Sequence, residues 1–262
     1  TMGQETAYDA VLLVAFGGPE GPDQVGPFLE RVTAGRGVPP GRLAEVAARY
    51  ERFGGVSPIN GRMRSLAAAV TDELAARRHD LPVFWGNRNA PPLLADVVAS
   101  IRDAGIERAL AWVASPYSAY STCRQYGEDL DAACRSVGAG APSIDRVRPH
   151  HDHPGLIGPT ADRLAEALAE FPEERRVGAH LLFSAHSLPT ALASTCGYVD
   201  QLRDAARLVA ERVDPDGGHP WEVVWQSRSG SPHVPWLEPD VGDRIESLAA
   251  EGVRAVAVSP LG

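Results

Sequence analysis

Short apolar runs alternate with longer amphipathic segments along most of this chain. The apolar runs have the length of strands and occur at 9–16, 81–85, 108–114, 179–184, 221–225 and 253–258. Between them, apolar residues recur at helical spacing, at 61–78, 92–104, 123–136, 159–170, 198–213 and 240–250. Strands that alternate with helices favour βαβ units, so the pattern predicts an α/β fold with largely parallel sheets flanked by helices.

Two pairs of segments resemble each other. "AVLLVAFGGP" (10–19) and "AHLLFSAHSLP" (179–189) both pass from an apolar strand into a turn closed by proline, and "GIERALAWVASP" resembles "GVRAVAVSP". Strands of α/β proteins look alike in general, which is one explanation. The other is a chain of two similar halves, 1–145 and 146–262. Ligands of open α/β folds bind beyond the carboxyl ends of the strands, so these turns would then line one cleft between the halves.

His186 follows one of these apolar runs directly and is predicted to stand at the carboxyl end of a strand. Near neutral pH an imidazole can accept a proton or ligate a metal. A hydrogen-bonded histidine of the core would fit the same position. The pattern therefore makes His186 a candidate without deciding between these roles.

Composition and charge exclude several classes of protein. The 262 residues are 44% hydrophobic and 23% charged, as in ordinary globular proteins, and the net charge of −9 argues against a nucleic-acid partner. The apolar runs are far shorter than the roughly 20 residues that cross a bilayer, so no membrane insertion is expected. An odd count of 3 cysteines without a CxxC pair predicts a reduced, cytoplasmic protein. Phosphate-binding loops and the GxSxG nucleophile motif are also missing from the sequence.

Two further strings carry arginines next to probable turns. "RYERFGGVSPIN" places Arg49 and Arg52 three residues apart before a Gly-Gly turn and the free hydroxyl of Ser57. These arginines could bind carboxylates through paired hydrogen bonds, or they could simply lie on the surface at a helix end. "WGNRN" places Arg88 between two asparagines after a strand, which suits a carboxylate clamp or an ordinary hydrogen-bonded turn equally well.

Aromatic and histidine-rich strings supply the remaining candidates. "SPYSAYSTC" offers the hydroxyls and flat faces of Tyr117, Tyr120 and Ser121, and a Pro-rich loop carries Trp236. Such groups suit a flat ligand with polar edges. "HHDH" (150–153) contains good metal ligands, but adjacent residues of an extended chain point to opposite sides, so these four side chains rarely bind one ion.

Taken together, these strings resemble the ferrochelatase family, especially its coproporphyrin ferrochelatases from actinobacteria. The resemblance rests on "LLVAFGGPEGPDQVGPFLERVTAGRG", "RYERFGGVSPIN", "WGNRN", "YSAYSTCRQY", "SAHSLP" and "WQSRSGSPHVPWLEPD", which occur in family order over nearly the whole chain. It implies two Rossmann-like, chelatase-type halves with a porphyrin cleft between them. It also implies insertion of ferrous iron into a porphyrin, which for this branch is coproporphyrin III, in haem biosynthesis.

The resemblance also assigns roles to single residues. His186 matches the family's histidine, which takes the pyrrole protons or contacts the metal. Phe16 falls where other members carry a Tyr or Met facing the metal from the opposite side, and a phenyl ring cannot ligate iron. Residues matching regions that hold the propionates, the ring edge and the cleft wall are Arg49, Arg52, Ser57, Arg88, Tyr117, Tyr120, Ser121 and Trp236.

Further expectations follow from the same resemblance. Cys123 matches a cysteine that ligates a 2Fe–2S cluster in actinobacterial relatives, but Cys134 and Cys196 match no other ligand, so no complete cluster is expected. We expect the native protein to continue beyond Gly262 with the family's Phe-Val-x-Asp-His-x-Glu segment, whose acidic residue partners the histidine. We also expect a monomer that passes its product to a downstream enzyme of haem synthesis.

Two other functions fit the same strings. One is a porphyrin- or haem-binding paralogue without catalytic activity. The other is a chelatase for another metal or tetrapyrrole, in which the "HHDH" segment at 150–153 would help to select the ion.

Overall fold

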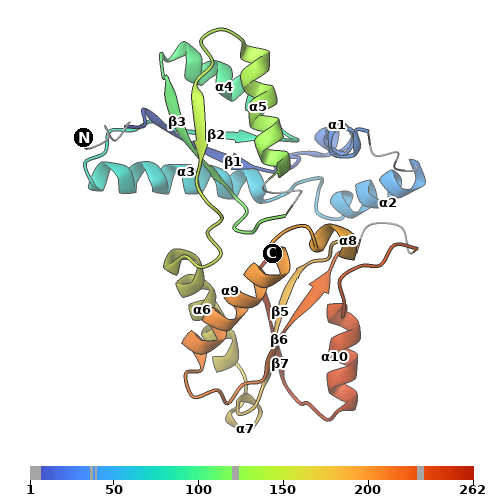
Figure 1. Ribbon diagram of the computed structural model, residues 1–262. Helices are drawn as coiled ribbons and strands as arrows, with labels where there is room; N and C mark the ends of the chain where they lie inside the picture. The colour runs from blue at the N-terminus through green and yellow to red at the C-terminus, as the bar shows by residue number, and fades with distance from the viewer. Residues whose placement is uncertain (1–6, 36–37, 39, 120–123, 229–232) are drawn as a thin grey trace. The chain divides into compact units, whose positions relative to one another are not determined.

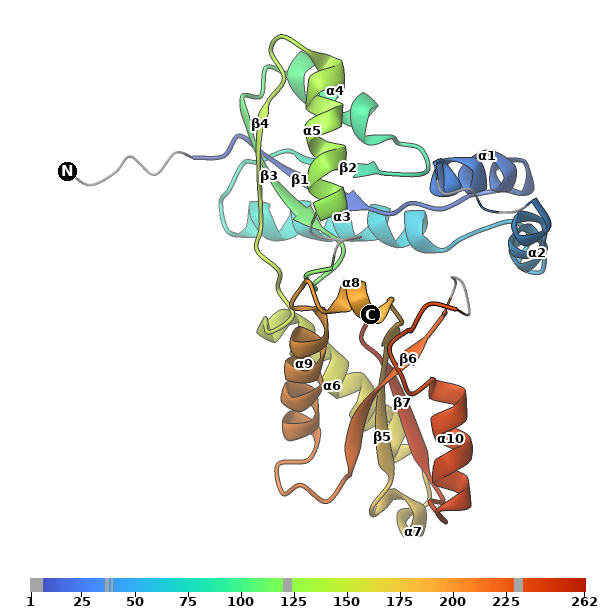
Figure 2. The same cartoon turned by 45° about the vertical axis from the view of Figure 1, so that its right-hand side comes forward.

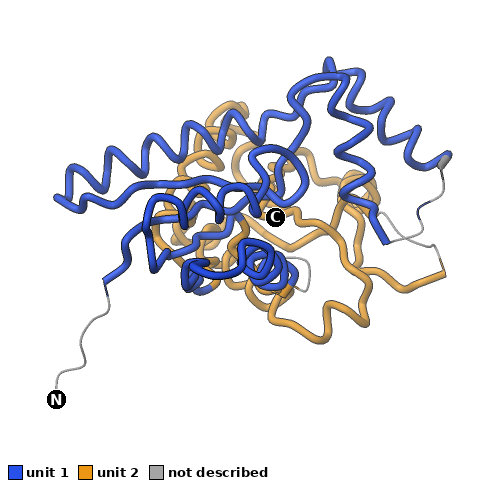
Figure 3. The backbone as a smooth tube through the Cα atoms, turned by 90° about the horizontal axis from the view of Figure 1, so that it is seen from above, with its two compact units in different colours: residues 1–114, 125–148 blue, residues 115–124, 149–262 orange. Residues whose placement is uncertain are grey.

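The computed structural model describes residues 7–262 apart from 36–37, 39, 120–123 and 229–232 (Figure 1). The chain divides into two compact units (Figure 3). Unit 1 consists of Thr1–Ala114 and Gln125–Arg148, and unit 2 consists of Ser115–Arg124 and Pro149–Gly262. The short segment Ser115–Arg124 thus groups with the second unit, although the strand before it belongs to the first.

Unit 1 is built on a four-stranded parallel sheet with the order β2-β1-β3-β4. Its strands are β1 (Ala10–Ala15), β2 (Val83–Asn87), β3 (Arg108–Val113) and β4 (Ser143–Arg146). Its helices are α1 (Pro22–Thr33), α2 (Pro40–Glu51), α3 (Ile59–Ala76), α4 (Leu94–Asp103) and α5 (Gln125–Val137).

The two faces of this sheet are covered by different helices (Figure 2). Alternate residues of β1 point to opposite faces, as they must in a strand. Leu12 and Val14 pack with α4 and α5, whereas Leu13 and Ala15 pack with Met63 of α3. Both faces of β1 are therefore buried, which explains why its sequence is a continuous apolar run instead of an alternating one.

Unit 2 contains a three-stranded parallel sheet with the order β6-β5-β7 among the described residues. Its strands are β5 (His180–His186), β6 (Trp221–Gln226) and β7 (Val256–Pro260). Its helices are α6 (Pro154–Ala169), α7 (Glu173–Arg176), α8 (Thr190–Ala193), α9 (Tyr198–Val213) and α10 (Val241–Ala250).

The central strand of unit 2 is again buried on both faces. Phe183 and Ala185 of β5 belong to the core formed with α6 and α9, and Leu182 packs with Leu248 of α10 on the opposite face. β1 is thus an interior strand of its sheet and β5 the central strand of its own, and each ends in a turn at the carboxyl edge (Figures 1 and 2).

The predicted α/β class with parallel sheets flanked by helices is confirmed. The alternation pattern did not predict α1 or α2, which both begin at prolines, or β4, which lies in a Pro/Gly-rich stretch. Proline suits the first turn of a helix because the amide hydrogen that it lacks has no partner there. No helix in the described part of the chain is long and apolar enough to cross a membrane.

Candidate functional site

His186 is the last residue of β5, and its backbone is held on both sides. Its N–H donates to the carbonyl of Gly262 at 3.0 Å, and its own carbonyl accepts the hydroxyl of Tyr198 at 3.0 Å. The imidazole itself is exposed and makes no hydrogen bond or ion pair with any described residue. The fold therefore fixes where the histidine stands and leaves both ring nitrogens available.

The surroundings of His186 keep its imidazole neutral. Burial by neighbouring protein atoms lowers the pKa of His186 below its usual value, because desolvation disfavours the charged form. No described charge opposes this effect. A neutral imidazole has a free lone pair, so this side chain can accept a proton or bind a metal at neutral pH.

The turn after His186 is attached to the loop that carries Trp236. Ser187 is 2% exposed, and its hydroxyl donates to the carbonyl of Leu237 at 3.0 Å. Two backbone hydrogen bonds flank this contact, from Leu237 N–H to Leu188 and from Thr190 N–H to Pro235, both at 2.9 Å. The half-buried Trp236 therefore lies on a loop that is fixed to the histidine's own turn.

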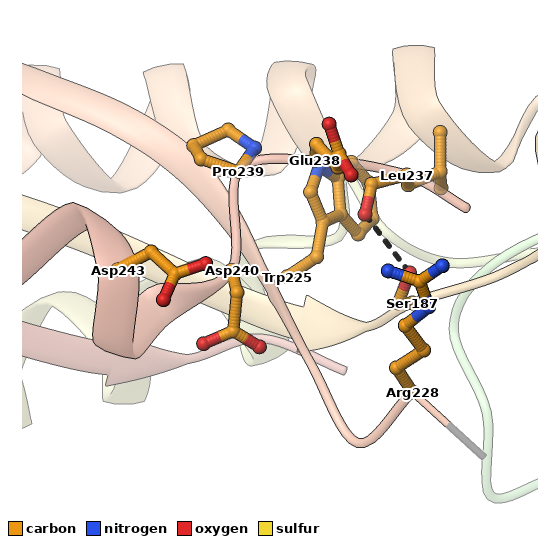
Figure 4. Close-up of a pocket in the computed structure, with 8 residues that line it drawn as sticks. All are labelled: Ser187, Trp225, Arg228, Leu237, Glu238, Pro239, Asp240 and Asp243. Atoms are coloured by element: carbon orange, nitrogen blue, oxygen red, sulfur yellow. Dashed lines mark hydrogen bonds between the residues drawn. The ribbon is translucent and has the colours of Figure 1, made fainter. Parts of the chain in front are cut away.

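A pocket of about 240 Å³ lies beside this attachment (Figure 4). Ser187, Trp225 and Arg228 line it together with the loop that enters α10. Three carboxylates also line it, those of Glu238, Asp240 and Asp243. Asp240 caps α10 by accepting the amide hydrogen of Gly242 at 2.8 Å, so at least this carboxylate has a structural role.

Phe16 follows β1 in unit 1 as His186 ends β5 in unit 2. Its side chain is 39% exposed, and its ring meets that of Phe28 edge-on with centroids 6.1 Å apart. Its carbonyl accepts two hydrogen bonds from Asn89, one from the backbone N–H at 3.1 Å and one from the side-chain amide at 3.2 Å. Phe16 thus exposes part of an apolar ring, and hydrogen bonds fix its backbone.

Buried amides hold the turn that follows Phe16. Asn60 is 1% exposed and bonds both backbone groups of Gly18, accepting from its N–H at 3.3 Å and donating to its carbonyl at 3.1 Å. Asn87, which is fully buried, donates to the side chain of Asn60 at 3.1 Å. Sequence reasoning missed Asn60, although it is the last residue of "RYERFGGVSPIN"; a buried amide beside a turn has no signature in the sequence pattern.

Arg88 is buried in unit 1 and already has a partner. Its side chain is 9% exposed and forms an ion pair with Asp129 of α5. Its guanidinium also lies over the rings of Tyr126 and Phe16, at 4.7 and 5.9 Å from their centroids. No pattern in the sequence indicates Asp129 as the partner of Arg88, because the two residues are far apart in the chain.

Arg49 and Ser57 line a shallow apolar groove of about 410 Å³ with Tyr50, Phe53 and Val56. Phe53 is 78% exposed, which is unusual for so large an apolar side chain. Arg49 and Arg52 are both exposed and form no ion pair with any described residue. The groove therefore combines an apolar wall with the positive charge of Arg49, which no described residue neutralises.

The remaining predicted residues are placed less favourably or lie outside the described residues. Tyr117 is 2% exposed in the core of unit 2 and packs edge-on against Tyr198 at 6.0 Å. Tyr120, Ser121 and Cys123 lie outside the described residues. The structure brings Tyr117 to the same unit as His186 and Trp236, and brings Phe16, Arg49, Arg52, Ser57 and Arg88 together in unit 1.

The "HHDH" segment does not act as one cluster. His153 accepts the amide hydrogen of Gly155 at 3.0 Å and so caps α6, and His151 lies 3.6 Å from Asp204. Among the residues that the structure describes, no three His, Cys, Asp or Glu side chains are grouped so as to hold a metal ion.

Comparison with known proteins shows to which family this chain belongs. The sequence profile of the ferrochelatase family matches residues 8–262, almost all of the chain. This chain therefore belongs to the ferrochelatase family.

Among its relatives are three actinobacterial proteins named coproporphyrin III ferrochelatase. That of Mycolicibacterium smegmatis is 51% identical over 259 residues, covering 98% of this chain and 75% of that protein. Those of Streptomyces coelicolor and Streptomyces griseus are 48% and 47% identical over 270 residues, covering 97% of this chain and 72% of each protein. A solved Deinococcus radiodurans protein, described as structurally similar to chelatases, matches with a TM-score of 0.47 and 16% identity over 96% of this chain and 51% of that one, too distant to bear on function.

Proposed function

We propose that this chain is a coproporphyrin III ferrochelatase, which inserts ferrous iron into the porphyrin to form coproheme. The observation that carries the proposal is His186, an exposed, neutral imidazole without a partner among the described residues, at the end of the central strand of its sheet. Relatives about half identical to this chain over nearly all its length bear the same name.

The reaction explains why a neutral imidazole is needed. A free-base porphyrin has two pyrrole N–H protons that must leave before four nitrogens can bind the iron. His186 accepts these protons one at a time and releases each to solvent, since its lowered pKa leaves one ring nitrogen unprotonated at neutral pH. The hydrogen bonds of its backbone to Gly262 and Tyr198 hold in place the main chain from which the imidazole extends.

Unit 1 supplies the features that suit a flat, carboxylate-bearing ligand. We assign the propionates of the substrate to Arg49 and Ser57, which line an apolar groove, and to the exposed Arg52 nearby in the chain. Arginine is well suited to this task because its planar guanidinium donates two parallel hydrogen bonds to a carboxylate. Phe16 would contribute an apolar contact to the macrocycle, whereas the same role for Trp236, which belongs to unit 2, stays a prediction.

An iron–sulfur cluster is not supported by the cysteines at hand. Such a cluster needs four thiolates, and the chain has 3 cysteines. Cys134 and Cys196 lie in different units, and burial raises the pKa of the Cys134 thiol, which favours the protonated form. The described residues do not fit a cluster, and no step of the proposed reaction uses one. That Cys123 ligates a cluster stays a prediction.

Location and partners complete the proposal. We place the protein in the cytoplasm as a monomer that delivers coproheme to a downstream enzyme of haem synthesis. The cysteine content supports a reducing compartment, because 3 thiols without a CxxC pair form no disulfide framework.

The test is anaerobic incubation of the protein with coproporphyrin III and ferrous iron, following the loss of free-base fluorescence. We expect metallation by the wild type and a loss of about 10²–10⁴-fold in kcat for His186→Ala, the range for a positioned general base. His79→Ala, a change at an exposed histidine of unit 1, is the matched control and should metallate normally. A wild-type protein that binds the porphyrin without ever metallating it would contradict the proposed activity and support a porphyrin-binding paralogue.

A further inference from the structure

The surroundings of Arg88 do not suit a carboxylate clamp. The sequence allowed this arginine to bind a propionate, but its side chain is 9% exposed and already forms an ion pair with Asp129. Arg88 lines a pocket of about 340 Å³ together with Asp129, so a ligand carboxylate there would have to compete with Asp129 for the same cation. The side chain of Asp129 is 33% exposed, but separating the pair is still costly because it leaves the buried guanidinium of Arg88 without compensation.

The guanidinium of Arg88 instead contacts two aromatic rings. It lies 4.7 Å from the ring centroid of Tyr126 and 5.9 Å from that of Phe16. A planar guanidinium stacks on aromatic faces and keeps its orientation when a carboxylate holds it. Asp129 and Tyr126 are both on α5, so this helix determines where the guanidinium lies.

Phe16 is held by this guanidinium on one side and by Phe28 on another. The two phenyl rings meet edge-on at 6.1 Å, with an interplanar angle of 75°. The backbone is fixed as well, because the N–H of Arg88 donates to Ala15 at 3.0 Å. The remaining 39% of the Phe16 side chain is exposed at the carboxyl edge of the sheet.

We propose that Asp129 and Arg88 are positioning residues that orient the ring of Phe16 toward the porphyrin, and that Arg88 does not bind a propionate. This inference rests on the proposed function, because it assigns Phe16 a macrocycle to contact. A phenyl ring cannot ligate iron, so Phe16 acts through its position alone. Its orientation sets how the macrocycle lies at the end of β1, and small misplacements of reacting groups cause large losses of rate.

The two roles of Arg88 predict opposite effects of Asp129→Asn. If Arg88 were a clamp, removing the competing carboxylate would free the arginine and tighten the binding of a porphyrin that carries carboxylates. If Arg88 positions Phe16, the same change loosens the guanidinium and lowers kcat with little effect on affinity. The loss should then be independent of carboxylates on the porphyrin.

The experiment compares wild type, Asp129→Asn, Arg88→Lys and Asp131→Asn. Coproporphyrin III and its tetramethyl ester are supplied from the same detergent micelles, Kd is measured by fluorescence, and kcat is measured with ferrous iron under anaerobic conditions. For Asp129→Asn and Arg88→Lys we expect kcat to fall by about 10-fold or more with both porphyrins, as misplacement of reacting groups does, while Kd changes less than about 3-fold. Asp131→Asn removes an exposed carboxylate of the same helix and should match the wild type.

Three results would overturn the inference. Tighter binding of coproporphyrin III, but not of its ester, by Asp129→Asn would make Arg88 a clamp. Wild-type kcat in both variants would remove any positioning role while leaving the proposed function intact. Absence of metallation by the wild type would contradict the proposed function and the inference together. Should Asp129→Asn fail to fold, Arg88→Lys decides, since lysine keeps the charge beside Asp129 and lacks the planar group.

Discussion

The turns after β1 and β5 occupy equivalent places in their sheets but are built differently. After β1, buried amides and an ion pair surround the turn, and its exposed residue, Phe16, is held through its side chain. After β5, hydrogen bonds hold the backbone and the neighbouring Ser187, while the imidazole of His186 forms no hydrogen bond or ion pair with a described residue. The first turn fixes the apolar ring of Phe16, whereas the second leaves the imidazole of His186 without a polar partner among the described residues.

The largest expected effect on stability comes from a substitution in the turn after β1. Gly17 has φ of +79°, and an added Cβ would lie 2.8 Å from the Cβ of Asn87. We expect Gly17→Ala to lower the free energy of unfolding by about 2–5 kcal/mol, because it combines left-handed strain with overpacking. Urea denaturation measures this loss.

Gly105→Ala provides the control for backbone strain alone. Gly105 has φ of +73° but nothing within 4 Å of an added Cβ. Its loss should be about 1–2 kcal/mol, the cost of left-handed backbone for a residue with a side chain. Equal losses for the two variants would show that the crowding around Gly17 is unimportant.

A smaller effect on stability is expected from removing a polar side chain at each of the two turns. Asn60→Ala leaves both backbone groups of Gly18 without their side-chain partner, so we expect a loss of about 1–3 kcal/mol in the free energy of unfolding. His186→Ala should change it by less than about 0.5 kcal/mol, because the exposed imidazole has no hydrogen bond or ion pair with a described residue to lose. Denaturation of both variants tests the contrast, which fails if His186→Ala is the more destabilising change.

The smallest expected effect is the pH dependence of metallation, which reports the protonation state of His186. Burial lowers the pKa of His186, so the ring stays neutral as the pH falls through the usual histidine value of 6.5. Metallation should therefore persist at this pH and decline only at lower pH, as His186 becomes protonated. An NMR titration of the imidazole alongside the pH profile of kcat would check this, and a midpoint above 6.5 in both would refute it.

The lowered pKa of His186 also makes the stability of the fold depend on pH, in a direction that can be stated. Because the folded-state pKa of His186 lies below that of the unfolded chain, the unfolded state binds more protons between the two values. The free energy of unfolding should thus rise with pH across this window and be lowest below it. The exposed position of the side chain keeps this contribution small.

The sequence predicted the parallel α/β class and the place of His186, because both depend on local patterns. An apolar run of strand length followed by a polar residue is visible in "LLFSAHSLP", and β5 ends at the predicted histidine. The partners of Arg88 and Gly18 were not predictable in this way. Asp129 and Asn60 reach them only through the packing of α5 and α3 on the sheet, and no spacing in the sequence encodes such contacts.

The lack of polar partners around the imidazole of His186 also bears on which residues the requirement to fold protects from substitution. The imidazole makes no hydrogen bond or ion pair with any described residue, so folding alone places little constraint on position 186. Asn60 differs, because the folded protein needs its hydrogen bonds. Under the proposed function, the reaction constrains the histidine at position 186, whereas folding constrains the asparagine at position 60.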